Sequence, residues 1–230
     1  MPAGAGFEWL REGWASFAAY PGQWVGITAI TGVISLCLMV VPFIGQLALY
    51  MLLPILIAGM LQVCLNIRGD EHPHIRDLFV AFKGDVSQLV ITGLLNLAAT
   101  FAIGLMLSVI AQGSALSGIF LGAPGLLGLG AVMGGMMVSG LFAVVLLTLL
   151  MMALWFAPAL VFFHNMKAWP ALKASFEACA RNWLAFFVFG LISLIMLFFA
   201  LLPLGLGLFV VIPILVGSLY AAYCDIFVAR

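Results

Sequence analysis

The chain has 230 residues, of which 66% are hydrophobic and 7% are charged, whereas soluble proteins carry about 25% charged residues. This composition excludes an ordinary soluble domain and indicates an integral membrane protein. Eight basic and eight acidic side chains give a formal net charge of zero. No basic stripe is present that would neutralise phosphates, so nucleic acid is not an expected partner.

Six segments are predicted to be membrane-spanning helices, because a helix needs about 20 apolar residues to cross about 30 Å of hydrocarbon. They cover approximately residues 24–43, 46–65, 86–111, 136–163, 183–202 and 206–226, and none contains Lys, Arg, Glu or His. The start of the chain lacks the features of a removable signal peptide, so we expect the first spanning helix to target the protein. The predicted fold is all-α: a polytopic membrane protein with six transmembrane helices in three hairpins, forming a single transmembrane domain over residues 1–230.

The charged residues predict which side of the membrane each connection faces. The connections at residues 42–45, 112–135 and 203–205 carry no charge, whereas the termini and the other two loops carry all of it. Because Lys and Arg accumulate in short cytoplasmic loops, both termini are predicted to be cytoplasmic. We therefore expect a multi-pass protein of the bacterial inner membrane.

The first cytoplasmic loop, RGDEHPHIRD at residues 68–77, concentrates charge and histidine. His72 and His74, with the neighbouring carboxylates and His164 from the next loop, are candidate ligands for a divalent metal. The simpler interpretation is a solvated loop in which a helix begins at Pro73. Closely spaced ligands on one loop rarely close a coordination shell, so we expect neither a metal nor a cofactor.

Other reactive side chains show no catalytic or ligand spacing. The cysteines are expected to pack as inert thiols; they are Cys37, Cys64, Cys179 and Cys224. Met133, Met136 and Met137 could hold Cu(I), although methionine is also an ordinary apolar filler. Neither Ser117 nor Ser139 lies in the glycine-flanked motif of a serine hydrolase, and no phosphate-binding glycine loop is present. An enzyme is therefore not expected.

An internal repeat appears when the chain is shifted by 159 positions. Residues 15–67 then align with residues 174–226 without a gap, with twelve identities that include Ser16/Ser175, Trp24/Trp183 and Pro54/Pro213. The middle of the chain resembles a weaker third copy. We expect repeat units at about residues 7–67, 73–164 and 170–227.

Each unit is predicted to begin with an amphipathic helix that lies at the cytoplasmic membrane interface with its apolar face down. The predicted faces are Phe7, Leu10, Trp14 and Phe17; Ile75, Leu78, Phe79 and Phe82; and Trp169, Leu172, Phe176 and Cys179. Each helix is followed by a hairpin. Tryptophans at the same level are expected to anchor the protein at the interface.

Polar and helix-breaking residues within the spans are the candidates for a site in the membrane. Pro54, Pro158 and Pro213 each remove a backbone donor in the cytoplasmic half of an even-numbered span. Three matching kinks would open a cytoplasmic vestibule, although proline is also tolerated in spanning helices. Asn96, near the middle of the third span, either bonds to another helix or faces a path for a neutral solute.

A glycine-rich insert at about residues 112–135 is the most distinctive region. Small residues four positions apart, Gly118/Gly122 and Gly130/Gly134, would allow another helix or a second subunit to approach closely. Alternatively, the insert is a re-entrant hairpin packed inside the protein. Both interpretations remain open from the sequence.

The motifs GWASF (residues 13–17), WFAPALV (155–161), ARNW (180–183) and SLYAAYCDIF (218–227) resemble the uncharacterised BPSS-type family of proteobacterial inner-membrane proteins. The resemblance extends over essentially the whole chain. It implies a six-helix bacterial membrane protein and supplies no catalytic residue.

We therefore expect a non-enzymatic scaffold or accessory subunit that acts through helix contacts made by the glycine-rich insert. The alternative is a permease or lipid-handling protein for a neutral or amphipathic small molecule. Membrane lipids are expected partners in both cases, and the first hypothesis adds a homo-oligomer or another membrane protein.

Overall fold

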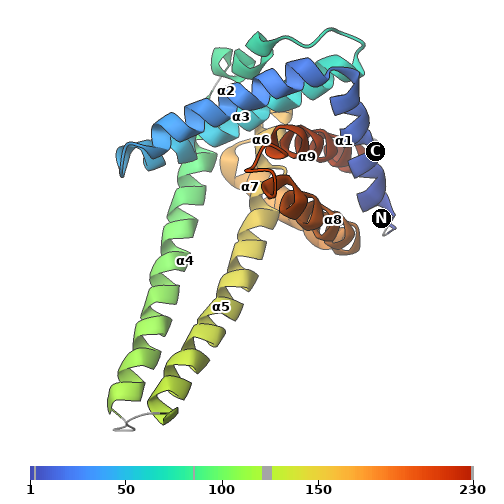
Figure 1. Ribbon diagram of the computed structural model, residues 1–230. Helices are drawn as coiled ribbons and strands as arrows, with labels where there is room; N and C mark the ends of the chain where they lie inside the picture. The colour runs from blue at the N-terminus through green and yellow to red at the C-terminus, as the bar shows by residue number, and fades with distance from the viewer. Residues whose placement is uncertain (3, 85, 121–125, 229–230) are drawn as a thin grey trace. The chain divides into compact units, whose positions relative to one another are not determined.

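A computed structural model describes residues 1–230 except 3, 85, 121–125 and 229–230, and the side chains of residues 114–129, 131 and 132 are also outside the described set. The described residues form helices and no strand, which confirms the predicted all-α fold (Figure 1). Six helices are long and apolar enough to cross a membrane. They are Pro21–Met39, Ile44–Arg68, Ser87–Gly113, Met133–His164, Trp183–Leu201 and Leu208–Val228.

The chain packs as two compact units. The larger unit consists of Met1–Leu94 and Ala153–Arg230, and the smaller unit is Leu95–Met152. The larger unit contains α1 (Ala5–Ala19), α2 (Pro21–Met39), α3 (Ile44–Arg68), the 3-10 helix η1 (Ile75–Lys83), α6 (Ala157–His164), α7 (Ala168–Arg181), α8 (Trp183–Leu201), α9 (Leu208–Tyr223) and the π-helix η2 (Cys224–Val228). The smaller unit contains most of α4 (Ser87–Phe120) and α5 (Leu126–Leu154).

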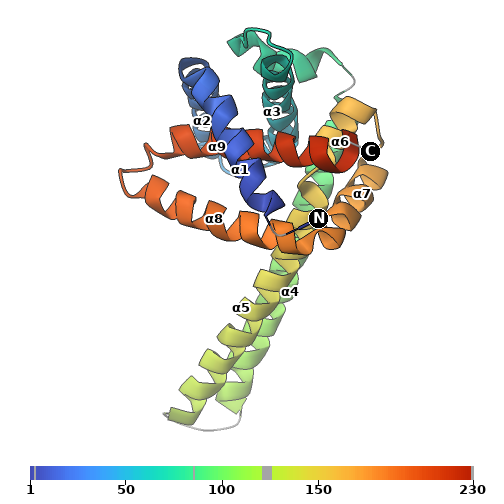
Figure 2. The same ribbon diagram turned by 90° about the vertical axis from the view of Figure 1, so that its right-hand side faces the viewer.

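Within the larger unit, each charged amphipathic segment packs on an apolar helix from elsewhere in the chain. The first, α1, lies against α9; η1 lies against α3; and α7 lies against α6 (Figure 2). In every case the supporting helix ends the hairpin of a different predicted repeat unit. Three equivalent repeats would produce this arrangement, and the repeat itself stays a prediction.

Glycine allows two of these contacts to be very close. A Cβ atom added at Gly13 of α1 would overlap the backbone of α9 at the Ile214 carbonyl, and one added at Gly59 of α3 would overlap the Leu78 carbonyl of η1. Only a hydrogen at these positions lets the backbones approach to this separation. The docking of α1 and η1 therefore depends on single glycines.

The predicted apolar faces of the amphipathic segments are divided between protein contact and exposure. Phe7, Trp14, Ile75, Phe79, Phe82 and Trp169 are exposed, whereas Leu10, Phe17 and Leu78 of the same predicted faces are buried. The buried stripe of α7 consists of small side chains, among them Ala171, Ser175 and Ala178, while α1 buries Gly6 and Gly13 together with Trp9, Leu10 and Phe17. The exposed aromatic side chains are those left for the lipid side.

The prolines also differ in their local structure. Pro54 lies inside α3 and Pro213 lies inside α9, as expected. Pro158 instead lies in the first turn of α6, because the fourth span is interrupted at residues 155–156. The Phe156 amide at this interruption donates a hydrogen bond to Ser175 Oγ at 3.0 Å. Proline is favoured at a helix start because its missing N–H has no helical partner there.

We predict that Gly13→Ala destabilises the protein, because the added methyl group must push α1 away from α9. Overpacking of this kind costs about 1–3 kcal/mol, so thermal unfolding in detergent, followed by circular dichroism, should begin at a lower temperature. Gly22→Ala is the matched control, since an added Cβ there meets nothing within 4 Å. Equal unfolding temperatures for both variants would contradict the close contact.

The exposed aromatic faces predict which tryptophans touch lipid. Trp14 is 54% exposed and Trp169 is 70% exposed, whereas Trp24 is fully buried. The measurement uses proteoliposomes that contain brominated phospholipid, because a bromine atom quenches only a tryptophan ring that it approaches closely. Trp14→Phe and Trp169→Phe should each reduce the part of the tryptophan fluorescence that this lipid quenches. Trp24→Phe should leave the quenched component unchanged. Loss of the quenched component in Trp24→Phe alone would show that the faces are assigned wrongly.

Candidate functional site

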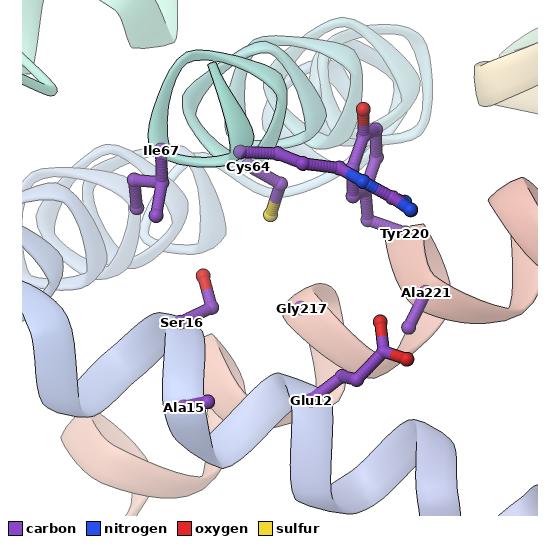
Figure 3. A pocket seen from close by; sticks show the side chains of 9 residues that line it. Glu12, Ala15, Ser16, Cys64, Ile67, Gly217, Tyr220 and Ala221 are labelled. Atoms are coloured by element: carbon purple, nitrogen blue, oxygen red, sulfur yellow. The ribbon is translucent and has the colours of Figure 1, made fainter. Parts of the chain in front are cut away.

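A partly open cavity of about 270 Å³ lies where α1, α3 and α9 meet. It is lined by Glu12, Ala15 and Ser16 from α1, by Cys64, Ile67 and Arg68 from α3, and by Gly217, Tyr220 and Ala221 from α9. Figure 3 shows the Ser16 hydroxyl and the Cys64 sulfur pointing into this space from opposite helices. We call it the junction cavity.

A second opening, of about 610 Å³, continues along the N-terminal half of α1. It shares Glu12, Arg68 and Ala221 with the junction cavity and adds residues from the two ends of the chain, among them Glu8, Cys224 and Asp225. The two spaces therefore adjoin, and we refer to them together as the recess. Its charged side chains include Arg68, the last residue of α3, and Asp225 of η2. Both therefore lie at the ends of membrane-spanning helices.

Hydrogen bonds fix α1, which forms one wall of the recess. Trp9 Nε1 donates to Asp225 Oδ2 at 3.1 Å, and Trp24 Nε1 donates to the Ser16 carbonyl at 3.1 Å. The Trp9 ring also packs on Phe186 of α8, with ring centroids 5.1 Å apart. The two terminal segments must therefore lie on one side of the membrane. That this side is the cytoplasm stays a prediction from the distribution of positive charge.

The charges of the recess differ in how they are paired. Glu8 forms an ion pair with Arg11 at 3.0 Å, and the Asp225 carboxylate accepts the bond from Trp9. Glu12 and Arg68 form no ion pair with any described residue within 4.0 Å. The junction cavity thus has one acidic and one basic group at its mouth and mainly apolar walls behind them.

Ser16 places a solvent-shielded hydroxyl between α1 and α3. Its Oγ faces the Cys64 sulfur (Figure 3). Ser175, at the equivalent position of the predicted repeat, accepts the Phe156 amide instead. A thiol is a weak hydrogen-bond partner, so the Ser16 hydroxyl is only weakly compensated for its loss of water.

A polar network holds η1 on the adjacent part of α3. Gln62 Nε2 donates to Asn66 Oδ1 at 2.8 Å, and Asn66 Nδ2 donates to Asp77 Oδ2 at 3.0 Å. The same carboxylate oxygen accepts the His74 amide at 2.8 Å. Because Asp77 is buried, these bonds supply the partners that its charge requires. The network fixes the loop that follows Arg68.

The predicted proline and asparagine sites lie outside the junction cavity. Pro54 and Pro213 are buried, and the cavity is lined by residues further along the same two helices. Asn96 is half-buried and accepts a hydrogen bond from Thr100 of its own helix at 3.3 Å. Its polar group is thus used within α4, and no hydrogen bond from Asn96 to another described helix is observed.

The glycine-rich insert continues α4 and α5 over the residues that the structure describes. Gly118 lies in α4, but its surroundings are outside the described set, as is Gly122 altogether. An added Cβ at Gly130 or Gly134 of α5 would meet nothing within 4 Å. No described side chain therefore covers Gly130 or Gly134.

The histidines have aromatic neighbours. His72 packs on Tyr20 and His164 on Tyr223, with ring centroids 5.5 and 5.8 Å apart. Across the described residues, no three His, Cys, Asp or Glu side chains converge to hold a metal ion. Burial raises the pKa of the Cys179 thiol on α7 to about 12, so this thiol stays protonated at neutral pH.

The junction cavity is not visible in the sequence, where Glu12 and Arg68 are charges beside separate apolar segments. The Ser16/Ser175 identity is visible, but the different environments of the two hydroxyls are not. No spacing in the sequence indicates that residues of α1, α3 and α9 line one cavity.

The chain is 31% identical over 231 residues to a probable inner membrane protein of Burkholderia thailandensis, and the alignment covers 96% of this chain and 82% of that protein. The chain belongs to the same family. This confirms the resemblance to proteobacterial inner-membrane proteins and, together with the six apolar helices, a multi-pass inner-membrane location. No family profile and no solved structure matches this family member.

For this member of the family, we predict opposite effects of removing the two equivalent hydroxyls. Ser175→Ala leaves the Phe156 amide without its partner in a buried environment and should cost about 1–3 kcal/mol. Ser16→Ala removes a hydroxyl whose neighbour is the weakly bonding Cys64 thiol, and it should leave the unfolding temperature equal or higher. Thermal unfolding of both variants in detergent tests this, and a larger loss for Ser16→Ala would show that its hydroxyl is bonded.

Proposed function

We propose that this inner-membrane protein is a non-enzymatic scaffold or accessory subunit that acts through contacts of the α4–α5 hairpin with another transmembrane helix. The observation that supports the proposal is a set of uncovered glycines on α4 and α5. At Gly104, Gly113, Gly130, Gly134 and Gly140, an added Cβ would meet no described atom within 4 Å, and Gly130 and Gly134 lie one helical turn apart. Small residues are favoured where helices approach closely in a bilayer.

The length of the hairpin supports contact with protein as well as with lipid. Helix α4 has 34 residues and α5 has 29, which correspond to about 51 and 44 Å at 1.5 Å per residue. The hydrocarbon core is about 30 Å thick. Neither helix contains a charged residue. The helical turns that extend beyond the hydrocarbon core therefore have no charged side chain that would favour contact with water over contact with protein.

The other side chains of the smaller unit are suited to a helix partner. Large apolar side chains point outward along both helices, among them Phe101, Leu105, Val109, Met133, Met137 and Leu141. Methionine adapts its shape to different partners because its side chain is unbranched and flexible. A contact surface that combines open glycines with methionine can accept a neighbouring helix at short distance.

We predict that Gly130→Leu or Gly134→Leu abolishes recovery of a stoichiometric partner or homo-oligomer in mild detergent, because the new side chain blocks close approach. Gly190→Leu is the control, since Gly190 also lies in a spanning helix with open space around it. Chemical crosslinking in membranes, followed by mass spectrometry, measures the loss. Unchanged crosslinks in both α5 variants would overturn the proposal.

The junction cavity favours a second function, the handling of lipids or other amphipathic molecules. Its mouth is charged, its walls are mainly apolar, and it lies at the ends of spanning helices. Binding sites for small molecules combine these features. This function is compatible with a scaffold role, because the two features belong to different parts of the chain.

A further inference from the structure

We infer that the junction cavity and its continuation bind the headgroup of a zwitterionic phospholipid, with Glu12 facing the ammonium group and Arg68 facing the phosphate. The inference rests on the second function proposed above and is independent of the scaffold proposal. It assigns a ligand class and two binding residues.

Charge selects the headgroup. Glu12 and Arg68 line both parts of the recess and form no ion pair with a described residue. A headgroup with one positive and one negative group satisfies both at once. A purely anionic headgroup would also meet Glu12, together with Glu8 and Asp225, which line the larger part. A purely cationic molecule would meet Arg68 instead.

The shape of arginine and the position of the recess agree with this ligand. Guanidinium presents several N–H donors in one plane and matches phosphate oxygens in pairs. Arg68 is the last residue of α3, and α3 is a spanning helix. The side chain therefore lies at the level where phospholipid headgroups meet the hydrocarbon, where basic side chains extend from the ends of spans.

The interior of the recess suits the part of the lipid next to the headgroup. The apolar lining of the junction cavity includes Ala15, Ile67 and Gly217, which are small or lack polar side-chain atoms. Ser16 and Cys64 line the same space, with the hydroxyl and the sulfur facing each other (Figure 3). The volumes of about 270 and 610 Å³ accommodate a headgroup, while acyl chains remain in the surrounding bilayer.

The walls are held in place before any ligand enters. Gly217 of α9 lies against Gly13 of α1, since a Cβ added at Gly217 would come within 2.9 Å of the Gly13 Cα. The bond from Trp9 to Asp225 holds η2 against α1 beside the larger part of the recess. Because these contacts order the site in advance, binding does not have to order the helices themselves.

The test is native mass spectrometry of the full chain in detergent, titrated separately with dioleoyl phosphatidylethanolamine, dioleoyl phosphatidylglycerol and dioleoylglycerol. We expect one phosphatidylethanolamine to bind about tenfold more tightly than either other lipid, as expected for charge-assisted hydrogen bonds. Glu12→Gln should remove the preference over phosphatidylglycerol. Arg68→Gln should weaken both phospholipids. The charge exchange Glu12→Arg with Arg68→Glu should restore part of the preference.

Glu177→Gln and Arg181→Gln are the matched controls, because both residues are exposed on α7 and neither lines the recess. Circular dichroism verifies that each variant is folded. Binding of the three lipids with equal affinity, unaffected by Glu12→Gln and Arg68→Gln, would overturn this inference while leaving a lipid-handling function intact. Absence of any bound lipid at saturating concentrations would overturn both.

Discussion

The larger unit depends on the close approach of two helix backbones, α1 and α9. Gly13 and Gly217 meet at this crossing, where neither position has room for a side chain. The crossing brings the start of the chain against its last span and allows Trp9 to bond to Asp225. It also forms one wall of the junction cavity. The absence of side chains at these two glycines therefore determines both how the terminal segments pack and where the candidate site lies.

Exclusion of charge from hydrocarbon explains why the buried core lies near the charged ends of the spans. The charged segments α1, η1 and α7 must stay near water, and each covers the end of an apolar helix. Asp77 is buried there only because Asn66 and the His74 amide satisfy its carboxylate. Further along the spans the side chains become exposed, as at Val40 and Leu204, because lipid covers them in the membrane.

The two proposed functions use regions with different physical character. The junction cavity combines charges with ordered walls, which favours recognition of a polar headgroup. Helices α4 and α5 of the smaller unit present glycines with no described atom close to them and carry no charge, which favours contact with another helix. The family relationship establishes an inner-membrane protein, and the site geometry supplies the chemical reasons for choosing among its functions.

The sequence alone determined the all-α class, the spanning segments and the membrane location, because these follow from the length of apolar runs and from charge. It could not determine which face of an amphipathic segment packs on protein. The spacing of Phe7, Leu10, Trp14 and Phe17 places them on one apolar face, but in the structure Leu10 and Phe17 are buried in the protein while Phe7 and Trp14 are exposed. The candidate site was decided only by the tertiary structure. Glu12, Ser16, Arg68 and Tyr220 are far apart in the chain, and the folded helices bring them to one recess.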